Sequence, residues 1–550
     1  MTQTSKSTPK RGDKEPPALS AQQSAEASAV SESVNRLFKL VPEIGVGWRW
    51  YDVPYRVFSW LLNAWPRPIL PSTIRRSLVG GINFLLVFNN HERNKAEPLD
   101  DPNDNLILPD GARLRQGGIW TVELFPPSKY NNLASALRHN GWDQSPFSGF
   151  DSSNVESVRR ARDGGGSAWF KIVSVTGKNT TYLQFDARSE ELPREFAAIE
   201  LTAVQLGTGV TAVVAFFQLS EYGESSLNNV WCKKHEPSLR WRGLRRPLTA
   251  NRFFAAIETT QKERLRLHNL TRRWLSKRCP GFFAARSDSH PAMDLNLFDG
   301  VDIAAQKGTL SDESLRALGM CRFGRDQYVS PELSGATLIP TYGSSGPHEP
   351  LHNCWAIAGE YQRIINENER SGYGDKPYCP MAIGFMFNDA ARSFVLYLAV
   401  MGFLDEQRAV HSAARDLATI RHRKFTIRAI RNLSEELLES GLDLPAMARD
   451  SKKLWGERWQ SWHGLTVQSI PWDAKPEKEE IDLIKFFGEH CTDQFKQLLE
   501  EDKNYRTVLS TAAALGSSVE SAQMGRNALL VAGVSMVVAL VTLLVALSDT

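Results

Sequence analysis

The chain has 550 residues, of which 42% are hydrophobic and 23% are charged, a balance typical of globular proteins. This length allows about two to four domains, each with its own core. The formal net charge of +3 is small for so long a chain, so no global field attracts nucleic acid, and nucleic acid is not an expected partner.

The cysteine pattern points to reduced thiols. No CxxC pair and no regular spacing occurs, which argues against a disulfide framework and against a zinc finger. Residues 1–35 contain no apolar stretch of signal-peptide length, so we expect the bulk of the chain on the cytoplasmic side of a membrane. The six cysteines are Cys232, Cys279, Cys321, Cys354, Cys379 and Cys491.

Residues 1–110 divide into two parts. Residues 1–35 are mostly Ser, Thr, Lys, Glu, Gln, Ala and Pro, and too few are apolar to offset the entropy of ordering, so they are predicted to be a disordered tail. Residues 36–110 are an aromatic-rich helical segment in which Asp52 caps a helix that tolerates Pro54 and ends at Pro66. Its apolar face would carry Tyr55, Phe58, Leu62 and Trp65.

Two interpretations of residues 48–65 stay open. With several arginines nearby, the helix would suit a position in the membrane surface. The interpretation that we prefer is that its aromatic side chains pack on the next domain. Residues 77–88 are also apolar but too short to span a bilayer, so we expect them to form a core element.

Residues 111–285 are predicted to form an α+β domain with an antiparallel sheet and packed helices. The clearest signal is a hairpin of residues 197–206 and 210–219 around Gly207-Thr208-Gly209, whose glycines permit positive φ. Further strands are expected at 119–125, 169–175 and 181–185, and helices at 128–137 and 250–277.

Residues 286–350 are rich in Gly, Ser, Asp and Pro and are predicted to be a loop-rich connector. If the protein is an enzyme, its site is expected in residues 286–380, where acidic residues and histidines accumulate, although no single one is identified as catalytic. These residues are Asp294, Asp299, Asp302, His348, Glu349 and His352.

A metal site in this region is not expected, and neither is a cofactor. His348, Glu349, His352 and Cys354, with Cys379 further on, are residue types that bind metals. Pro350 lies between the two histidines and breaks the helical geometry that would bring them together. The start of a helix at residues 352–369 is the preferred interpretation.

Residues 351–527 are predicted to be a helical domain that leads to the membrane. Helices are expected at 352–369, 388–418 and 420–440, and from about residue 477 towards the anchor. Residues 394–404 are an apolar run too short to span a bilayer, so we expect a helix buried on all sides. The basic run at 421–424 is better explained as a solvated helix face than as a phosphate-binding patch.

Residues 528–547 contain no charge over twenty positions, which predicts a single transmembrane helix, because a bilayer core of about 30 Å needs roughly 20 apolar residues. The chain would then be tail-anchored and single-pass. Steps of three and four residues place small side chains on one face, where we expect the helix to associate with a copy of itself or with another span. This helix-packing stripe consists of Ala528, Ala532, Ser535, Ala539, Thr542 and Ala546.

Function is only coarsely indicated. The chain has no P-loop, HExxH, GxSxG, EF-hand or kinase signature. We expect a membrane-anchored cytoplasmic protein that binds partners, senses a signal or serves as a scaffold. The alternatives are a membrane-anchored enzyme with its site in residues 286–380 and a subunit of an oligomeric pore. The lipid bilayer is the expected partner.

Overall fold

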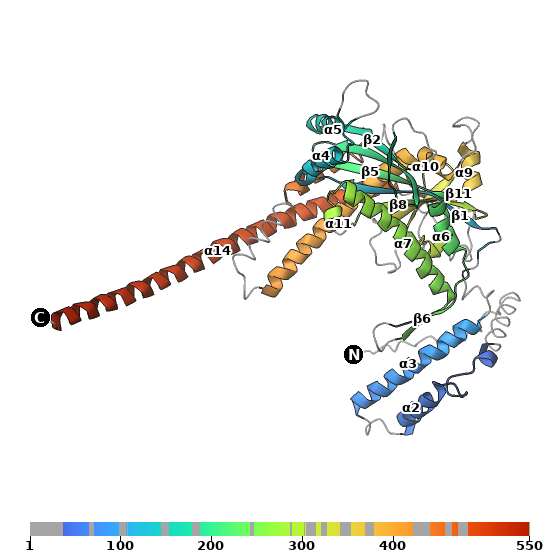
Figure 1. Cartoon of the computed structure of the whole chain (residues 1–550), viewed down its shortest axis with the longest axis horizontal. Helices are drawn as coiled ribbons and strands as arrows, with labels where there is room; N and C mark the ends of the chain where they lie inside the picture. Colours follow the sequence, from blue (N-terminus) through green and yellow to red (C-terminus); the bar gives the residue numbers. More distant parts are fainter. Residues whose placement is uncertain are drawn as a thin grey trace, which may run out of the picture. The chain divides into compact units, whose positions relative to one another are not determined.

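The structure is a computed structural model in which two compact units can be described (Figure 1). The larger unit takes Leu108–Lys233 and Ile257–Thr550, and the smaller takes Met1–Ile107 and Lys234–Ala256. The residues that the structure describes are 37–64, 71–97, 106, 108–109, 111–144, 153–178, 187–241, 247–286, 289–301, 303, 315–320, 327–341, 354–368, 379–421, 441–456, 465–470 and 482–548.

The larger unit is mixed α+β, with a ten-stranded sheet and packed helices. Its strands are β1 (Arg113–Leu124), β2 (Ser167–Gly177), β3 (Ala187–Glu190), β4 (Phe196–Leu206), β5 (Val210–Leu219), β8 (Ala292–Asp299), β9 (Gln327–Val329), β10 (Ala336–Pro340), β11 (Cys354–Glu360) and β12 (Gln468–Ile470). Its helices are α4 (Tyr130–His139), α5 (Asn154–Asp163), α6 (Glu221–Trp231), α7 (Arg252–Arg278, within this unit from Ile257), α9 (Tyr361–Asn368), α10 (Pro380–Met386), α11 (Asn388–Arg421) and α14 (Leu483–Ser548).

The strand order is β12-β9-β10-β11-β8-β1-β5-β4-β2-β3. Most neighbours are antiparallel, but β11 runs parallel to β8, and β3 runs parallel to β2. The sheet is therefore mixed, and this corrects the expectation of an antiparallel sheet within residues 111–285. The parallel β8–β11 pair arises because the chain forms β9 and β10 before it returns to the sheet beside β8.

Both faces of the sheet are covered. On one face Trp120 stacks on Phe216 with ring centroids 4.5 Å apart, and its Nε1 donates to Asn388 Oδ1 of α11 at 2.8 Å. On the other face Phe217 meets Trp274 of α7 edge-on at 5.6 Å. Because strands alternate their side chains between faces, two buried faces require nearly continuous apolar strands, as β4 and β5 are.

Two expectations for the helices are confirmed. Residues 394–404 of α11 are all buried except Met401, as predicted for a helix enclosed on all sides. The last helix, α14, continues unbroken over 66 residues. Its first turns belong to the core, where Phe487 packs on Trp355 with ring centroids 6.1 Å apart and Phe495 packs on Phe403 at 6.4 Å.

The strands and helices of residues 111–285 largely follow the prediction. The β4–β5 hairpin pairs antiparallel around a turn in which Gly207 has a φ of 60°. The expected strands at 119–125 and 169–175 form parts of β1 and β2, and the expected helices form α4 and α7. The strand predicted at 181–185 lies outside the described residues.

Two predicted segments differ from the structure. The described part of residues 286–350 contributes β8, β9 and β10 to the sheet, so it is more than a loop-rich connector. The helix predicted over 352–369 is wrong in its first half, because residues 354–360 form β11 between β8 and β10, and only α9 is helical. The backbone hydrogen bonds of two neighbouring strands outweigh a weak helical preference over so short a run.

The smaller unit contains α2 (Asp52–Ala64) and α3 (Ser72–Ala96) and the hairpin of β6 (Ser238–Trp241) and β7 (Pro247–Ala250). The Trp241 ring of β6 lies 5.9 Å from Phe84 of α3. The helix expected in residues 36–110 begins at Asp52 as predicted, whereas its expected end at Pro66 lies outside the described residues. The predicted tail, residues 1–35, also lies outside the described residues. So does the predicted helix at 420–440, except for residues 420 and 421, which end α11.

Gly118 tests how tightly the α11 face of the sheet is packed. A Cβ at this position would lie 2.3 Å from Phe216 Cε2, and Gly384 of α10 confines the same ring from another side. We expect Gly118→Ala to lower the free energy of unfolding by about 1–3 kcal/mol, because the ring cannot shift without displacing its neighbours. Gly166→Ala, with no atom within 4 Å, is the matched control and should change it by less than about 0.5 kcal/mol. Denaturant unfolding of the purified chain measures both, and equal effects would contradict this packing.

Candidate functional site

A buried charge network lies between α7 and the centre of the sheet. Arg264 and His268 are four residues apart on α7, so both side chains lie on the helix face that contacts β8. Asp294 of β8 is fully buried opposite them. Removing such groups from water costs roughly several kcal/mol for each ion, so the network depends on how completely its members are paired.

The Asp294 carboxylate has a partner at each oxygen. Its Oδ2 accepts from Arg264 Nε at 2.7 Å, and its Oδ1 accepts from His268 Nε2 at 2.6 Å and from Gln116 Nε2 of β1 at 3.1 Å. Arg264 also donates through Nη2 to Thr341 Oγ1 at 2.5 Å. One carboxylate thus connects α7 to two central strands, and Arg264 extends the network to the residue that follows β10.

The charges of this network reinforce one another. Burial would raise the pKa of Asp294, but the neighbouring charges of His268 and Arg264 hold that pKa well below its ordinary value. Burial would also lower the pKa of His268, yet the charge and hydrogen bond of Asp294 raise it. The two shifts therefore favour the ionised form of Asp294 and the protonated form of His268.

Cys354, the first residue of β11, lies on the other side of the His268 ring. Its Sγ is 3.9 Å from His268 Nδ1 and 3.8 Å from Arg272 Nη2. Burial would raise the pKa of this thiol, but the hydrogen bond and charge of His268, helped by Arg272 and Arg264, lower it to about 7. A thiolate beside an imidazolium that a carboxylate orients is the arrangement that activates a cysteine as a nucleophile.

Only part of this cluster was among the predicted candidates. Asp294 and Cys354 both fall in residues 286–380, where an enzyme site was expected, but His268 was not singled out. The signal that could have found it is the row of Arg264, His268 and Arg272, which repeats every four residues along α7 and marks one polar face.

The other acidic candidates do not join Asp294. Asp299 is five residues further along β8, and its Oδ2 accepts from Arg115 Nε at 2.7 Å in a half-exposed ion pair. Asp302, His348, Glu349 and His352 lie outside the described residues.

The structure also bears on the residue types considered for a metal site. Among the described residues, no group of three or more His, Cys, Asp or Glu side chains is arranged to hold a metal ion. Cys354 contacts His268, and Cys379 is exposed at the start of α10.

A second buried pair shows that a carboxylate and a histidine alone do not define a site. Glu123 Oε2 of β1 accepts from His290 Nε2 at 2.8 Å, and the same carboxylate accepts the backbone N–H groups of Phe283 and Ala284. This pair fixes the loop that follows α7. The His268 cluster differs from this pair because its histidine also contacts a thiol, that of Cys354.

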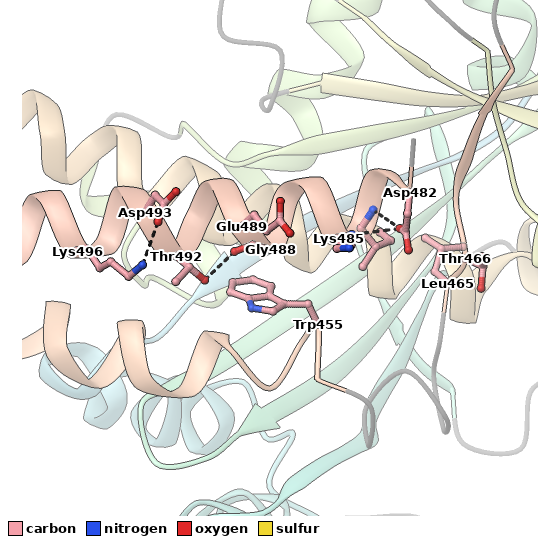
Figure 2. A pocket seen from close by; sticks show the side chains of 11 residues that line it. Trp455, Leu465, Thr466, Asp482, Lys485, Gly488, Glu489, Thr492, Asp493 and Lys496 are labelled. Carbon is pink, nitrogen blue, oxygen red and sulfur yellow. Dashed lines mark hydrogen bonds and ion pairs between the residues drawn. The ribbon is translucent and has the colours of Figure 1, made fainter. Parts of the chain in front are cut away.

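A groove of about 650 Å³ opens along the first turns of α14 (Figure 2). The Trp455 ring lies against Gly488, where an added Cβ would come within 2.7 Å of the ring. Both acidic and basic side chains line the groove, and Lys496 pairs with Asp493 at 3.1 Å. The lining residues are Trp455, Leu465, Thr466, Asp482, Ile484, Lys485, Gly488, Glu489, Thr492, Asp493 and Lys496.

This groove is separate from the cysteine cluster, because none of its lining residues belongs to that cluster. Its open form and mixed charge suit an extended polar partner better than a small apolar ligand, since small-molecule sites are mostly enclosed and apolar.

The predicted membrane helix forms the distal part of α14. Within the part of the chain whose side chains are described, no single helix is both long and apolar enough to cross a bilayer, and the apolar segment Met524–Ala539 is shorter than a span. A bent pair, Pro380–Met386 with Asn388–Ala413, has the length and composition of a span, but its residues contribute to the core against the sheet.

The small-residue stripe is only partly visible. Ala528, Ala532, Ser535 and Ala539 are exposed on α14, whereas the side chains of Thr542 and Ala546 lie outside the described part. Helix packing through this stripe stays a prediction.

Comparison with protein-family models, with curated proteins and with solved structures gave no match to this chain.

Asp294→Asn tests the buried network. We expect it to lower the free energy of unfolding by about 3–5 kcal/mol, because Arg264 and His268 would keep their buried charges without the carboxylate. Asp299→Asn on the same strand is the matched control. It breaks a half-exposed pair, so its cost should stay below about 1 kcal/mol. Equal costs in urea unfolding would contradict the account.

The difference between Asp294→Asn and the parent chain should also depend on pH. Because the folded-state pKa of Asp294 lies below its ordinary value of 3.8, its contribution is present above that pH and is lost as the pH falls. The raised pKa of His268 has the opposite sign, so its contribution is present below 6.5 and declines as the pH rises through the folded-state pKa. A stability difference that does not shrink on acidification would contradict the assignment of Asp294 as the ionised partner.

Cys354 should react with iodoacetamide in a distinctive way. Since its thiol has a pKa of about 7, the alkylation rate should rise with pH and level off with a midpoint near that value. Cys232 is the internal reference, because burial raises the pKa of its thiol. Peptide mass spectrometry measures both rates. His268→Asn should move the Cys354 midpoint upward, and a parent midpoint as high as that of Cys232 would contradict the thiolate assignment.

Proposed function

We propose that this chain is a membrane-anchored protein whose larger unit binds partner molecules on the cytoplasmic side, with the distal part of α14 as its anchor. The observation that carries this proposal is the contrast between the two ends of α14. Near its start, apolar side chains are buried in the core, whereas the large apolar side chains described from Met524 to Val541 are exposed.

Exposed apolar side chains around a whole helix need an apolar environment. Leu529, Leu530 and Val531 are each more than half exposed, and because consecutive residues of a helix point about 100° apart, these three face different sides of α14. A helix that is apolar on all sides belongs either in a protein core or in lipid. The uncharged run of the sequence continues to residue 547, so as a helix it measures about 30 Å, the thickness of a bilayer core.

The charges and cysteines support the proposed orientation. Arg526 precedes the uncharged run, and a positive charge beside a membrane helix favours the cytoplasmic side. The five described cysteines are all free, including the exposed Cys232 and Cys379, as expected for proteins of a reducing compartment.

A binding role is favoured by the groove along α14 in Figure 2, which is open and lined by side chains of both charge signs. Self-association through the small-residue stripe would place several such grooves beside one another. Pore formation stays the third alternative, since within residues 528–547 only Ser535 and Thr542 carry polar side chains.

The enzyme alternative has one specific observation in its favour, the Cys354–His268–Asp294 arrangement. Its geometry suits a thiol nucleophile whose histidine partner is oriented by a buried carboxylate. The binding role remains the first proposal, because Cys354 is buried and the groove that we describe does not include it.

Deletion of residues 528–550 tests the anchor. We expect the full chain to remain in the membrane pellet after alkaline carbonate extraction and the deletion variant to appear in the supernatant, because the deletion removes the uncharged run. A variant in which Val534, Val537 and Val541 are each replaced by Lys is a matched control of full length. It should also be released, since each charge at the centre of a bilayer costs about 2.5–3.5 kcal/mol. Retention of both variants in the membrane pellet after carbonate extraction would contradict the anchor.

A further inference from the structure

The smaller unit presents apolar side chains to solvent from a rigid framework. Asp52 is fully buried at the start of α2, where its carboxylate accepts the backbone N–H groups of Gly45 and Arg49 and the Arg49 guanidinium. Tyr51 is also buried and donates to Glu92 of α3. These contacts fix the loop before α2 and therefore the directions of the side chains that it carries.

The inner side of α2 is packed on α3. The Phe58 ring lies so close to Gly81 that an added Cβ there would come within 2.8 Å of it. The Trp50 ring meets Phe88 of α3 edge-on at 4.7 Å, although the rest of Trp50 faces solvent. Because this side of α2 is already occupied, the helix cannot rotate to bury its outer side.

The outer side carries a set of apolar residues that we call the α2 surface. Val53, Val57 and Trp60 follow one stripe of the helix, at steps of four and three residues. Trp48 is 84% exposed and Trp60 is 64% exposed, which differs from the packing that we had expected for these aromatic residues. The α2 surface consists of Val46, Trp48, Trp50, Val53, Val57 and Trp60.

Cations accompany the α2 surface. The Arg56 guanidinium lies 4.6 Å above the Trp48 ring and donates to Gly47 O at 2.6 Å. Arg75 and Arg76 are exposed in the first turn of α3 beside the exposed Ile74.

The acidic groups near these cations are mostly neutralised. Asp52 is buried and paired with Arg49, and Glu92 contacts both Arg49 and Tyr51. Of the acidic residues described between positions 37 and 64, only Glu43 is exposed. The surface is therefore apolar and rich in Trp, and it carries the exposed Arg56 as a cation.

We infer that the α2 surface docks onto an anionic lipid bilayer, with its Trp rings at the level of the headgroups and its arginines on lipid phosphates. Trp favours this level because its ring is apolar and its N–H is polar, and an anionic lipid surface attracts nearby cations. The inference rests on the proposed function in one respect, namely that α14 brings the chain to a membrane. The surface would then hold the smaller unit at the bilayer independently of the anchor.

Amide hydrogen exchange of the full-length chain tests this inference. The chain is reconstituted into vesicles of phosphatidylcholine alone or with about one third phosphatidylglycerol, and peptides from α2 are followed by mass spectrometry. We expect exchange in α2 to slow by about tenfold or more in the anionic vesicles, because docking suppresses local opening. Val57→Ser with Trp60→Ser should abolish this slowing. Leu442→Ser, at an exposed position of the larger unit, should leave it unchanged.

The other outcomes overturn the inference in recognisable ways. Protection in detergent as strong as in vesicles would mean that another part of the chain covers the surface. Protection that follows the protein-to-lipid ratio rather than lipid charge would mean that a second copy covers it. Failure of the proposed anchor is recognised separately, because the chain would leave the vesicles in carbonate whether or not α2 is protected.

Discussion

The Asp294 carboxylate is the point at which the larger unit is held together electrostatically. It is fully buried, and it binds two cationic side chains of α7 and one amide of β1. Without it, two positive charges would remain inside the protein, so the α7 face of the sheet can form only in the register that delivers all partners together. The same constraint orients His268 towards Cys354, so the unusual thiol depends on this carboxylate.

The α11 face of the sheet uses a different principle. It is mainly apolar, with aromatic rings from the strands, α11 and the start of α14 in one cluster. Through this cluster, α14 is both a core element and the proposed stem of the anchor. Because each turn of this continuous helix is hydrogen-bonded to the next, the direction of its first turns in the core sets the direction of its distal part. The groove in Figure 2 runs along the first turns of α14, where the helix still packs on the core, so a partner bound there would contact both the helix and the residues beside it.

Several elements could be predicted from the sequence because their signals are local. The β4–β5 hairpin has two apolar runs and a glycine turn, and α7, α11 and α14 have lengths and boundaries that favour helices. β8 was missed although its apolar residues alternate, since Asp294 and Asn296 occupy the alternate positions and disfavour a strand on their own. Asp294 is explained by its partners Arg264 and His268, which lie on α7, an element distant in sequence.

The candidate site was harder to predict for the same reason. Cys354, His268 and Asp294 come from three separate elements, and no spacing in the sequence relates them. The exposure of Trp48 and Trp60 could not be foreseen either, because the same aromatic residues would suit a core or a membrane surface. Which of these applies is decided by the packing of α2 on α3, which occupies the other side of the helix.

The central claim is that the distal part of α14 lies within a bilayer. Its most direct measurement is an accessibility scan of spin labels placed singly at successive positions from 529 to 541 of the reconstituted chain. The account predicts that accessibility to oxygen is high and accessibility to a water-soluble nickel reagent is low at the positions beyond the first turn, apart from Ala532, Ser535 and Ala539 of the helix-packing stripe, because lipid would surround the rest of the helix. High accessibility to the nickel reagent on all sides of the helix would contradict the account. It would also be contradicted if accessibility varied with the helical repeat, so that one side was closed to both reagents and the opposite side was open to water.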